Sequence, residues 1–165
     1  MPNVQRITPF LWFDTQAEEA AKFYTGIFKN SKITKTAHYS EAGKEFHGKP
    51  PGSVLTVGFE LEGQHFTALN GGPQFKFTEA ISFVVHCETQ AEVDHYWEKL
   101  GAGGDPAAQQ CGWLKDKFGL SWQIVPNQLI AFLTDPDRAK AGRVMQVMMG
   151  MKKLNIAALE KAAAG

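Results

Sequence analysis

The chain has 165 residues, of which 44% are hydrophobic, including 12 Phe and 4 Trp. This composition supplies a packed core and excludes a disordered chain. Seventeen Lys and Arg balance 17 Asp and Glu, so the charge gives no reason to expect nucleic acid or a membrane surface as a partner. With two Cys, no visible secretory signal and no apolar run of about 18 residues, we expect a cytoplasmic protein.

The first predicted module, residues 1–73, reads as a β-α-β-β-β unit. An aromatic strand over residues 8–13 precedes a helix, for which Thr15 and Glu18 form a capping-box pattern. Alternating apolar residues then predict the later strands, and Glu62-Gly63 predicts a hairpin turn between the last two. These strands are expected over residues 33–39, 53–61 and 64–70, with a loop over residues 40–52.

The second predicted module, residues 74–128, repeats the plan of the first. The tetrapeptide TQAE of residues 15–18 recurs at residues 89–92, again directly after an apolar strand. Thr89 and Glu92 give a second capping box, and strands are expected over residues 80–87, 107–115 and 120–125. The fold class is therefore α+β, with two β-α-β-β-β modules in a cupped, pseudo-symmetric half-barrel pair.

A helical C-terminal extension, residues 129–165, lies outside the repeat. Asp135-Pro136 is typical of a helix start, and Asn155 is expected to cap a last helix over residues 156–164. Apolar side chains at helical spacing mark one face of the extension as core or as a dimer contact, and we expect a homodimer. They are Val144, Val147, Met148 and Met151.

The chain resembles the PhnB-like branch of the vicinal oxygen chelate superfamily over nearly its whole length. The most specific match is residues 111–126 (CGWLKDKFGLSWQIVP), and the tail from Phe132 to Leu159 also looks like this branch. The resemblance implies a pocket where the two modules meet, often completed across a homodimer. Further matching segments are 7–13 (ITPFLWF), 18–24 (EEAAKFY), 52–57 (GSVLTV), 66–73 (FTALNGGP) and 79–83 (EAISF).

Members of this branch often carry the name 3-demethylubiquinone-9 3-methyltransferase, but the residues here do not favour that chemistry. A methyltransferase of the usual kind needs a Gly-rich turn between a strand and a helix to approach its cofactor. The two corresponding turns, residues 14–16 (DTQ) and 88–90 (ETQ), contain no Gly. We therefore predict no binding of S-adenosylmethionine, and no other cofactor.

The superfamily's metal enzymes take His and Glu ligands from the first and last strand of each module. By resemblance these positions fall near Thr8, Thr67, Ala80 or Ser82, and Gln123. None of these residues is a strong ligand, so we predict no metal site. An atypical ligand set built from His65 and His86 is the alternative, and it would make the chain a metal-dependent lyase, isomerase or dioxygenase.

The leading hypothesis is a metal-independent protein that binds a small-molecule ligand. Aromatic walls with a few polar groups are typical of such pockets. The polar candidates lie in otherwise apolar strands, where they must pair with each other or serve a ligand. The predicted ligand-binding residues are Phe10, Trp12, Trp113, Thr8, His65, Thr67, Ser82 and Gln123. Cys87 and Cys111 are expected to be small packing residues. A purely structural protein, with the cup filled by side chains, is the third possibility.

Overall fold

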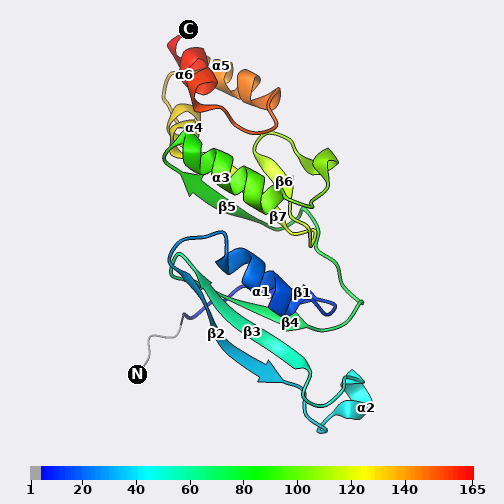
Figure 1. The fold of residues 1–165 in the computed structure, drawn as a ribbon. Helices are drawn as coiled ribbons and strands as arrows, with labels where there is room; N and C mark the ends of the chain where they lie inside the picture. The colour runs from blue at the N-terminus through cyan, green and yellow to red at the C-terminus, as the bar shows by residue number, and fades with distance from the viewer. Residues whose placement is uncertain (1–4) are drawn as a thin grey trace. The chain divides into compact units, whose positions relative to one another are not determined.

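The computed structural model describes residues 5–165. The chain divides into two compact units, the first ending at Lys76 and the second comprising residues 77–165. Each unit combines a small sheet with helices (Figure 1), which confirms the predicted α+β class. Within the described residues, none of the helices is long and apolar enough to cross a membrane.

The first unit is built on a four-stranded sheet with the order β1-β4-β3-β2. β1 runs parallel to β4, and the other pairs are antiparallel. Glu62 and Gly63, both at positive φ, form the predicted turn between β3 and β4. In chain order the elements are β1 (Phe10–Phe13), α1 (Ala17–Thr25), β2 (Ser31–His38), α2 (Lys44–His47), β3 (Val54–Leu61) and β4 (Gln64–Asn70). The short helix α2 lies in the segment predicted as a loop.

Helix α1 covers one face of this sheet and leaves the other face open (Figure 1). Val57, Phe59 and Leu61 alternate toward the helix and are buried, and the Tyr24 ring stacks on Phe59 with 5.9 Å between ring centroids. The intervening residues of β3 and β4, together with Phe10 and Trp12 of β1, occupy the opposite face. The period-2 pattern of residues 55–61 therefore identified the buried face correctly.

The start of α1 differs from the prediction. Its N-cap is Gln16 without a side-chain cap, so the Thr15–Glu18 capping box does not form. The buried Asn70 of β4 takes its place, because its Oδ1 accepts a hydrogen bond of 2.8 Å from Ala17 N. The first strand is also shorter than predicted: β1 begins at Phe10, which leaves Thr8 in the segment before it.

The second unit opens with the same strand-helix plan on a three-stranded sheet of order β5-β7-β6. Here the Thr89 half of the predicted capping box forms, since Thr89 Oγ1 accepts from Glu92 N at 3.2 Å. The Glu92 carboxylate reaches back to Glu88 N at 2.6 Å, one residue before the N-cap. The elements are β5 (Ser82–Cys87), α3 (Gln90–Gly101), the 3₁₀ helix η1 (Pro106–Ala108), β6 (Trp113–Lys115) and β7 (Ser121–Pro126). Of the predicted strand region 107–115, only β6 and one isolated bridge, between Gln110 and Trp113, are extended pairs.

A buried carboxylate, Asp116, organises the turn between β6 and β7. Its Oδ1 accepts hydrogen bonds from Phe118 N at 2.8 Å and Leu120 N at 3.1 Å, and its Oδ2 accepts from Trp122 Nε1 at 2.9 Å. Only 2% of Asp116 is exposed. A charge so deeply buried is tolerated only when it is well hydrogen-bonded, and these donors meet that need.

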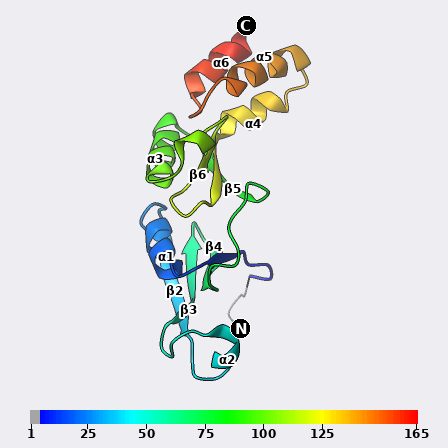
Figure 2. The same cartoon turned by 90° about the vertical axis from the view of Figure 1, so that its right-hand side faces the viewer.

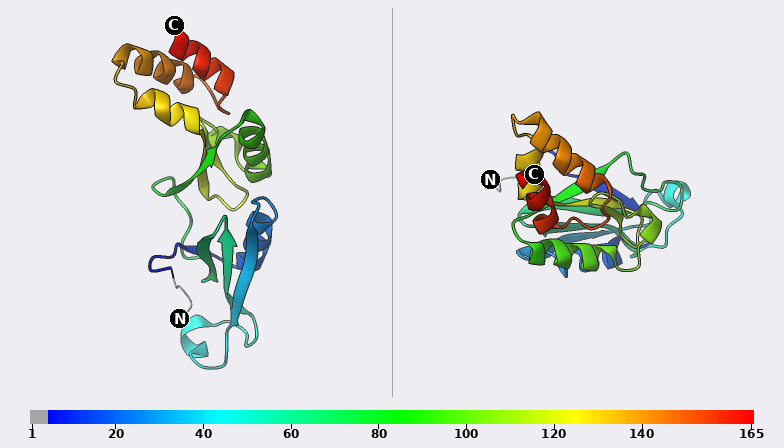
Figure 3. Two further views of the ribbon diagram at one scale, coloured as in Figure 1. Left: turned by 90° about the vertical axis from the view of Figure 1, so that its left-hand side faces the viewer. Right: turned by 90° about the horizontal axis from the view of Figure 1, so that it is seen from above.

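Three helices follow β7 and pack against one another, coloured yellow, orange and red in Figure 3: α4 (Asn127–Leu133), α5 (Arg138–Met149) and α6 (Ile156–Ala164). Helix α4 was not predicted. The N-cap of α5 is Asp137, not Asp135, whereas Asn155 caps α6 as predicted, accepting from Ala158 N at 2.8 Å.

The methionine-rich face of α5 belongs to an internal core. Val144 is fully buried with Leu129, Leu154 and Leu159, and Met148 and Met151 pack against this cluster. Of the four predicted face residues, only Val147 is exposed. The assignment of this face to core therefore holds for Val144, Met148 and Met151, whereas a dimer contact through the exposed Val147 stays a prediction.

The C-terminal helices are fastened to α3 and to the loop before β6. Gln90 of α3 donates from Nε2 to Leu154 O at 3.1 Å and accepts from Ile156 N at 2.8 Å. Cys111 N donates to Met151 O and Gly112 N to Lys152 O, both at 2.8 Å. Figure 2 shows α4 continuing from the end of the second sheet into α5 and α6. These backbone and side-chain bonds fix the helices on the second unit.

Candidate functional site

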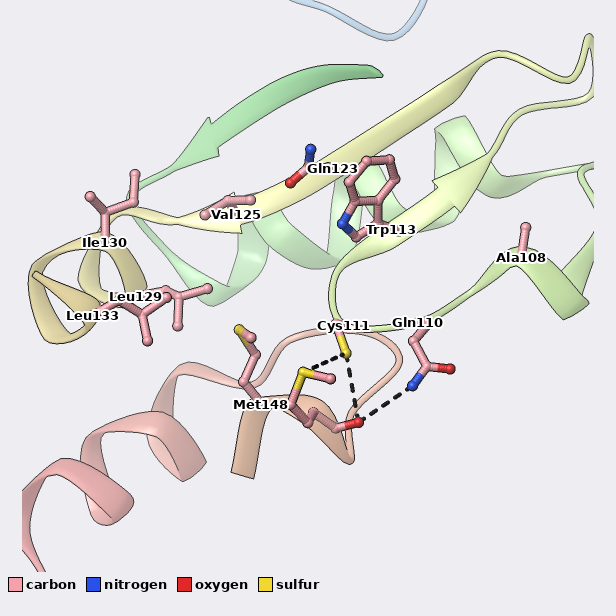
Figure 4. A pocket seen from close by; sticks show the side chains of 11 residues that line it. Ala108, Gln110, Cys111, Trp113, Gln123, Val125, Leu129, Ile130, Leu133 and Met148 are labelled. Atoms are coloured by element: carbon pink, nitrogen blue, oxygen red, sulfur yellow. Dashed lines mark hydrogen bonds between the residues drawn. The ribbon is translucent and has the colours of Figure 1, made fainter. Parts of the chain in front are cut away.

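An open pocket of about 630 Å³ lies in the second unit, between strands β6 and β7 and the helices α4 and α5 (Figure 4). Its size is within the range of about 300–1,000 Å³ of small-molecule sites. The lining residues are predominantly apolar: Ala108, Gln110, Cys111, Trp113, Gln123, Val125, Leu129, Ile130, Leu133, Met148 and Met149.

The strands place Trp113 and Gln123 side by side on one wall. Antiparallel pairing sets Trp113 opposite Gln123, and alternation directs both to the face away from the buried Trp122 and Ile124. Figure 4 shows both side chains projecting into the same space. The structure thus brings together two of the predicted ligand-binding residues, one aromatic and one polar.

Ser82 is a third predicted residue in this cluster. Gln123 Nε2 donates to Ser82 Oγ across β5 and β7 at 2.9 Å. In the structure the amide nitrogen faces β5, and Gln123 Oε1 has no hydrogen-bond partner among residues 5–165. The predicted pairing between polar strand residues is therefore confirmed for Gln123 and Ser82, and a contact of Gln123 with a ligand stays a prediction.

The two cysteines differ in environment. Cys87 is fully buried, and desolvation, with a smaller contribution from the Glu92 charge, raises the pKa of its thiol to about 12. Such a thiol stays protonated and acts as a packing residue, as predicted. Cys111 has a backbone φ of 50°, and its Sγ lies 3.6 Å from Met149 O and 3.8 Å from Met149 Sδ. Because Cys111 also lines the pocket, the predicted packing role describes it only in part.

The remaining predicted residues lie in the first unit. Phe10 pairs with Thr67 in the β1–β4 register, and Thr67 N donates to Pro9 O at 3.0 Å. Trp12 shares their face, where its Nε1 donates to Gly72 O at 2.9 Å and its ring meets Phe75 edge-on at 4.8 Å. Thr8 precedes β1 and is half-buried.

His65 belongs to the same open face and contacts an acidic neighbour. Its Nε2 lies 3.3 Å from Glu60 Oε1, and Lys32 Nζ lies 3.6 Å from Glu60 Oε2. His86, the other histidine of the predicted alternative metal set, is exposed on β5. Over residues 5–165, no three His, Cys, Asp or Glu side chains are grouped so that they could hold a metal ion.

Sequence reasoning missed the helical wall of the pocket. Leu129, Ile130 and Leu133 come from α4, and Met148 and Met149 come from α5. The only signal in the sequence was the apolar segment 127–133 (NQLIAFL) directly after the last strand. It is too short for its periodicity to distinguish a helix from a strand.

A substitution separates the two roles of Gln123. We expect Gln123→Leu to lower the free energy of unfolding by less than about 1 kcal/mol, because the half-buried Ser82 hydroxyl it leaves can bond to water. The same change should weaken ligand binding about tenfold, since the amide oxygen is lost from the wall. Thermal melting and binding titration of the variant measure both effects. A melting temperature far below that of the wild type would assign Gln123 to a structural network alone. Thr67→Val provides the matching measurement on the first unit.

Comparison with known proteins identifies relatives of the chain. The family described as 3-demethylubiquinone-9 3-methyltransferase matches residues 5–125. A solved structure described as a putative 3-demethylubiquinone-9 3-methyltransferase, PhnB protein, from Bacillus cereus is 38% identical, with 74% of this chain and 99% of that chain covered and a TM-score of 0.62. Curated protein sequences give no match.

Among more distant solved structures, one shares the fold with a TM-score above 0.5. A protein from Pseudomonas aeruginosa is 16% identical, with 74% of this chain and 98% of that chain covered and a TM-score of 0.56. A genomically encoded fosfomycin resistance protein, FosX, from Listeria monocytogenes is 15% identical, with 75% of this chain and 93% of that chain covered and a TM-score of 0.49. The match over residues 5–125 and the 38% identity to the Bacillus protein establish that this chain belongs to the PhnB-like family of the vicinal oxygen chelate superfamily.

Proposed function

We propose that the chain is a small-molecule-binding protein of the glyoxalase and bleomycin-resistance type, and that it binds its ligand without a metal ion. The observation that carries this proposal is the 630 Å³ pocket walled by Trp113 and Gln123. An aromatic surface beside an amide with a free acceptor is the combination that holds and orients a small organic molecule. An open pocket also favours binding over a purely structural role.

A ligand-induced melting screen tests this function. Neutral and charged small molecules are added to protein treated with a chelator, and the unfolding temperature is recorded. A ligand present at 100 times its dissociation constant should stabilise the protein by about 2.7 kcal/mol. We expect at least one such ligand, and we expect its effect to be lost in Gln123→Leu. A broad library that stabilises the wild-type protein neither after chelator treatment nor without it would refute the binding function.

The metal-dependent alternative is favoured by one contact, the pairing of His65 with Glu60 at 3.3 Å. Imidazole and carboxylate are the superfamily's usual ligands, but here Lys32 competes for the same carboxylate. We expect elemental analysis of protein purified without chelator to find far less than one divalent ion per chain. About one zinc, nickel, iron or manganese ion per chain, lost in His65→Ala, would replace the binding proposal with the metal-dependent enzyme.

The methyltransferase description of the family is not extended to this chain. The helix α1 begins after residues 14–16 and α3 after residues 88–90, and neither turn contains Gly. The chain therefore lacks the glycine-rich backbone turn that usually approaches a nucleotide-like cofactor, and the methyltransferase name has no support from these turns.

We also propose a homodimer that covers the open sheet faces. Phe10 on β1 is 59% exposed and Val84 on β5 is 42% exposed, and exposed apolar residues on a sheet face favour burial against a partner. Light scattering should give twice the 18.2 kDa chain mass. Val84→Glu should shift the protein toward monomer, while Met145→Glu on helix α5 should not. A wild-type monomer would contradict the proposal.

The cytoplasm is the proposed location, with no nucleic acid and no membrane as partner. Cys87 and Cys111 are free thiols, which suits a reducing compartment. The equal numbers of basic and acidic residues provide no general attraction to phosphate backbones.

A further inference from the structure

Part of the pocket wall lies beyond residue 125, where the match to the family ends. The family match ends at residue 125, and α4 begins at Asn127. The Bacillus relative aligns over 99% of its own length with only 74% of this chain. The α4 and α5 side chains that line the pocket are Leu129, Ile130, Leu133, Met148 and Met149, so the C-terminal helices add a wall that the family segment does not supply.

This wall is fixed in place before any ligand arrives. The loop that carries Cys111 is bonded to the segment after α5 through Cys111 N to Met151 O and Gly112 N to Lys152 O, each 2.8 Å. Gln110 Nε2 donates to Met149 O at 3.4 Å, as the dashed lines in Figure 4 show. A wall held by backbone hydrogen bonds loses little conformational freedom on binding, which favours a preformed pocket.

The lining restricts the chemistry of the ligand. It contains no Lys, Arg, His, Asp or Glu, so a charged molecule would lose hydration there without gaining an ion pair. Trp113 offers a flat aromatic surface, and Met148 and Met149 offer adaptable thioether side chains that suit ring contacts. Two groups on the strand wall have no hydrogen-bond partner among residues 5–165: Gln123 Oε1, which is an acceptor while the amide nitrogen donates to Ser82, and Trp113 Nε1, which is a donor.

We propose that the C-terminal helices convert this half of the fold into a pocket for a neutral, ring-containing molecule that carries a hydrogen-bond donor such as a hydroxyl or an N–H. The ring lies between Trp113 and the methionines of α5, and the donor bonds to Gln123 Oε1. The proposal rests on the proposed small-molecule function and specifies its ligand class and the elements that select it.

Three fluorescent probes with one ring skeleton test the ligand class. N-phenyl-1-naphthylamine is neutral and carries an N–H, its N-methyl derivative lacks the N–H, and 1-anilinonaphthalene-8-sulfonate adds a negative charge. We expect saturable one-to-one binding of the first, with each of the other two at least about tenfold weaker. Equal affinity for the sulfonate, or no saturable binding of the neutral probe, would overturn the proposed ligand class.

A matched pair of variants tests the role of the C-terminal helices. Met149 lines the pocket and Met145 does not, although both are on α5 and are 53% and 43% exposed. Met149→Glu should lower the affinity for the neutral probe at least about tenfold, because it places a charge in the wall. Met145→Glu should leave this affinity unchanged, and both variants should melt near the wild-type temperature. If Met149→Glu and Met145→Glu bind alike while Gln123→Leu loses affinity, the helices do not select the ligand, yet the small-molecule function stands. If Gln123→Leu also binds like wild type, both proposals fail.

Discussion

Replacing Asp116 by alanine is expected to destabilise the protein by about 3 kcal/mol, since hydrogen bonds to a buried charged group contribute about 1.5–3 kcal/mol each and are not additive. The substitution leaves the Trp122 indole N–H and the Leu120 amide N–H without their acceptor in a buried turn. It also removes the group that sets the β6–β7 register, on which the position of Gln123 depends. Chemical denaturation measures the loss.

Two controls separate the contributions to the Asp116 effect. Asp116→Asn keeps the shape and one acceptor oxygen, so it should cost less than the alanine variant. Combining Asp116→Ala with Trp122→Phe removes the stranded indole donor together with its acceptor, and the two changes should therefore cost less than the sum of their separate effects. A loss below about 1 kcal/mol for Asp116→Ala would show that the turn is held by other contacts.

The second large effect is expected at Leu159, in the core of the C-terminal helices. Leu159 is fully buried with Leu129, Val144 and Leu154, and Leu→Ala at such sites costs about 2–5 kcal/mol. Because Leu129 packs in this core and also lines the pocket, the cavity should loosen the helical wall as well. Leu159→Ala should therefore lower both the melting temperature and the affinity for N-phenyl-1-naphthylamine.

The neighbouring Glu160 provides a control on the same helix. It is exposed, so Glu160→Ala should change the free energy of unfolding by no more than about 0.5 kcal/mol and leave probe binding intact. Wild-type binding by Leu159→Ala at a temperature where the variant is folded would show that the strand wall binds the probe without help from the helices.

Local signals in the sequence predicted the fold where no distant residue competed with them. The Thr89 and Asn155 side-chain caps form as predicted, and Glu92 reaches back to the residue before the N-cap, because each bond needs only side chains within four residues. The same TQAE tetrapeptide failed at residues 15–18, since Asn70 reaches Ala17 N from β4, 53 residues away. A tertiary contact replaced a local one, and the local pattern contained no sign of it.

The candidate site was predictable in its strand wall and not in its helical wall. The opposition of Trp113 and Gln123 follows from strand alternation, and polar residues in apolar strands drew attention to Ser82 and Gln123. The contribution of α4 and α5 depends on how the C-terminal helices dock, which is set by bonds such as Gln90 to Leu154 across 64 positions. Helical spacing identified the apolar residues of α5 correctly but could not say which of them face the core or the pocket.

The central claim is that the pocket of the second unit binds a neutral small molecule without a metal ion. The most direct measurement is a fluorescence titration of N-phenyl-1-naphthylamine into protein stripped with a chelator, repeated after adding one equivalent of a divalent metal ion. We predict saturable one-to-one binding with the same affinity in both titrations. Binding that disappears in the stripped protein and returns with the added ion would contradict the claim and assign the site to a metal centre.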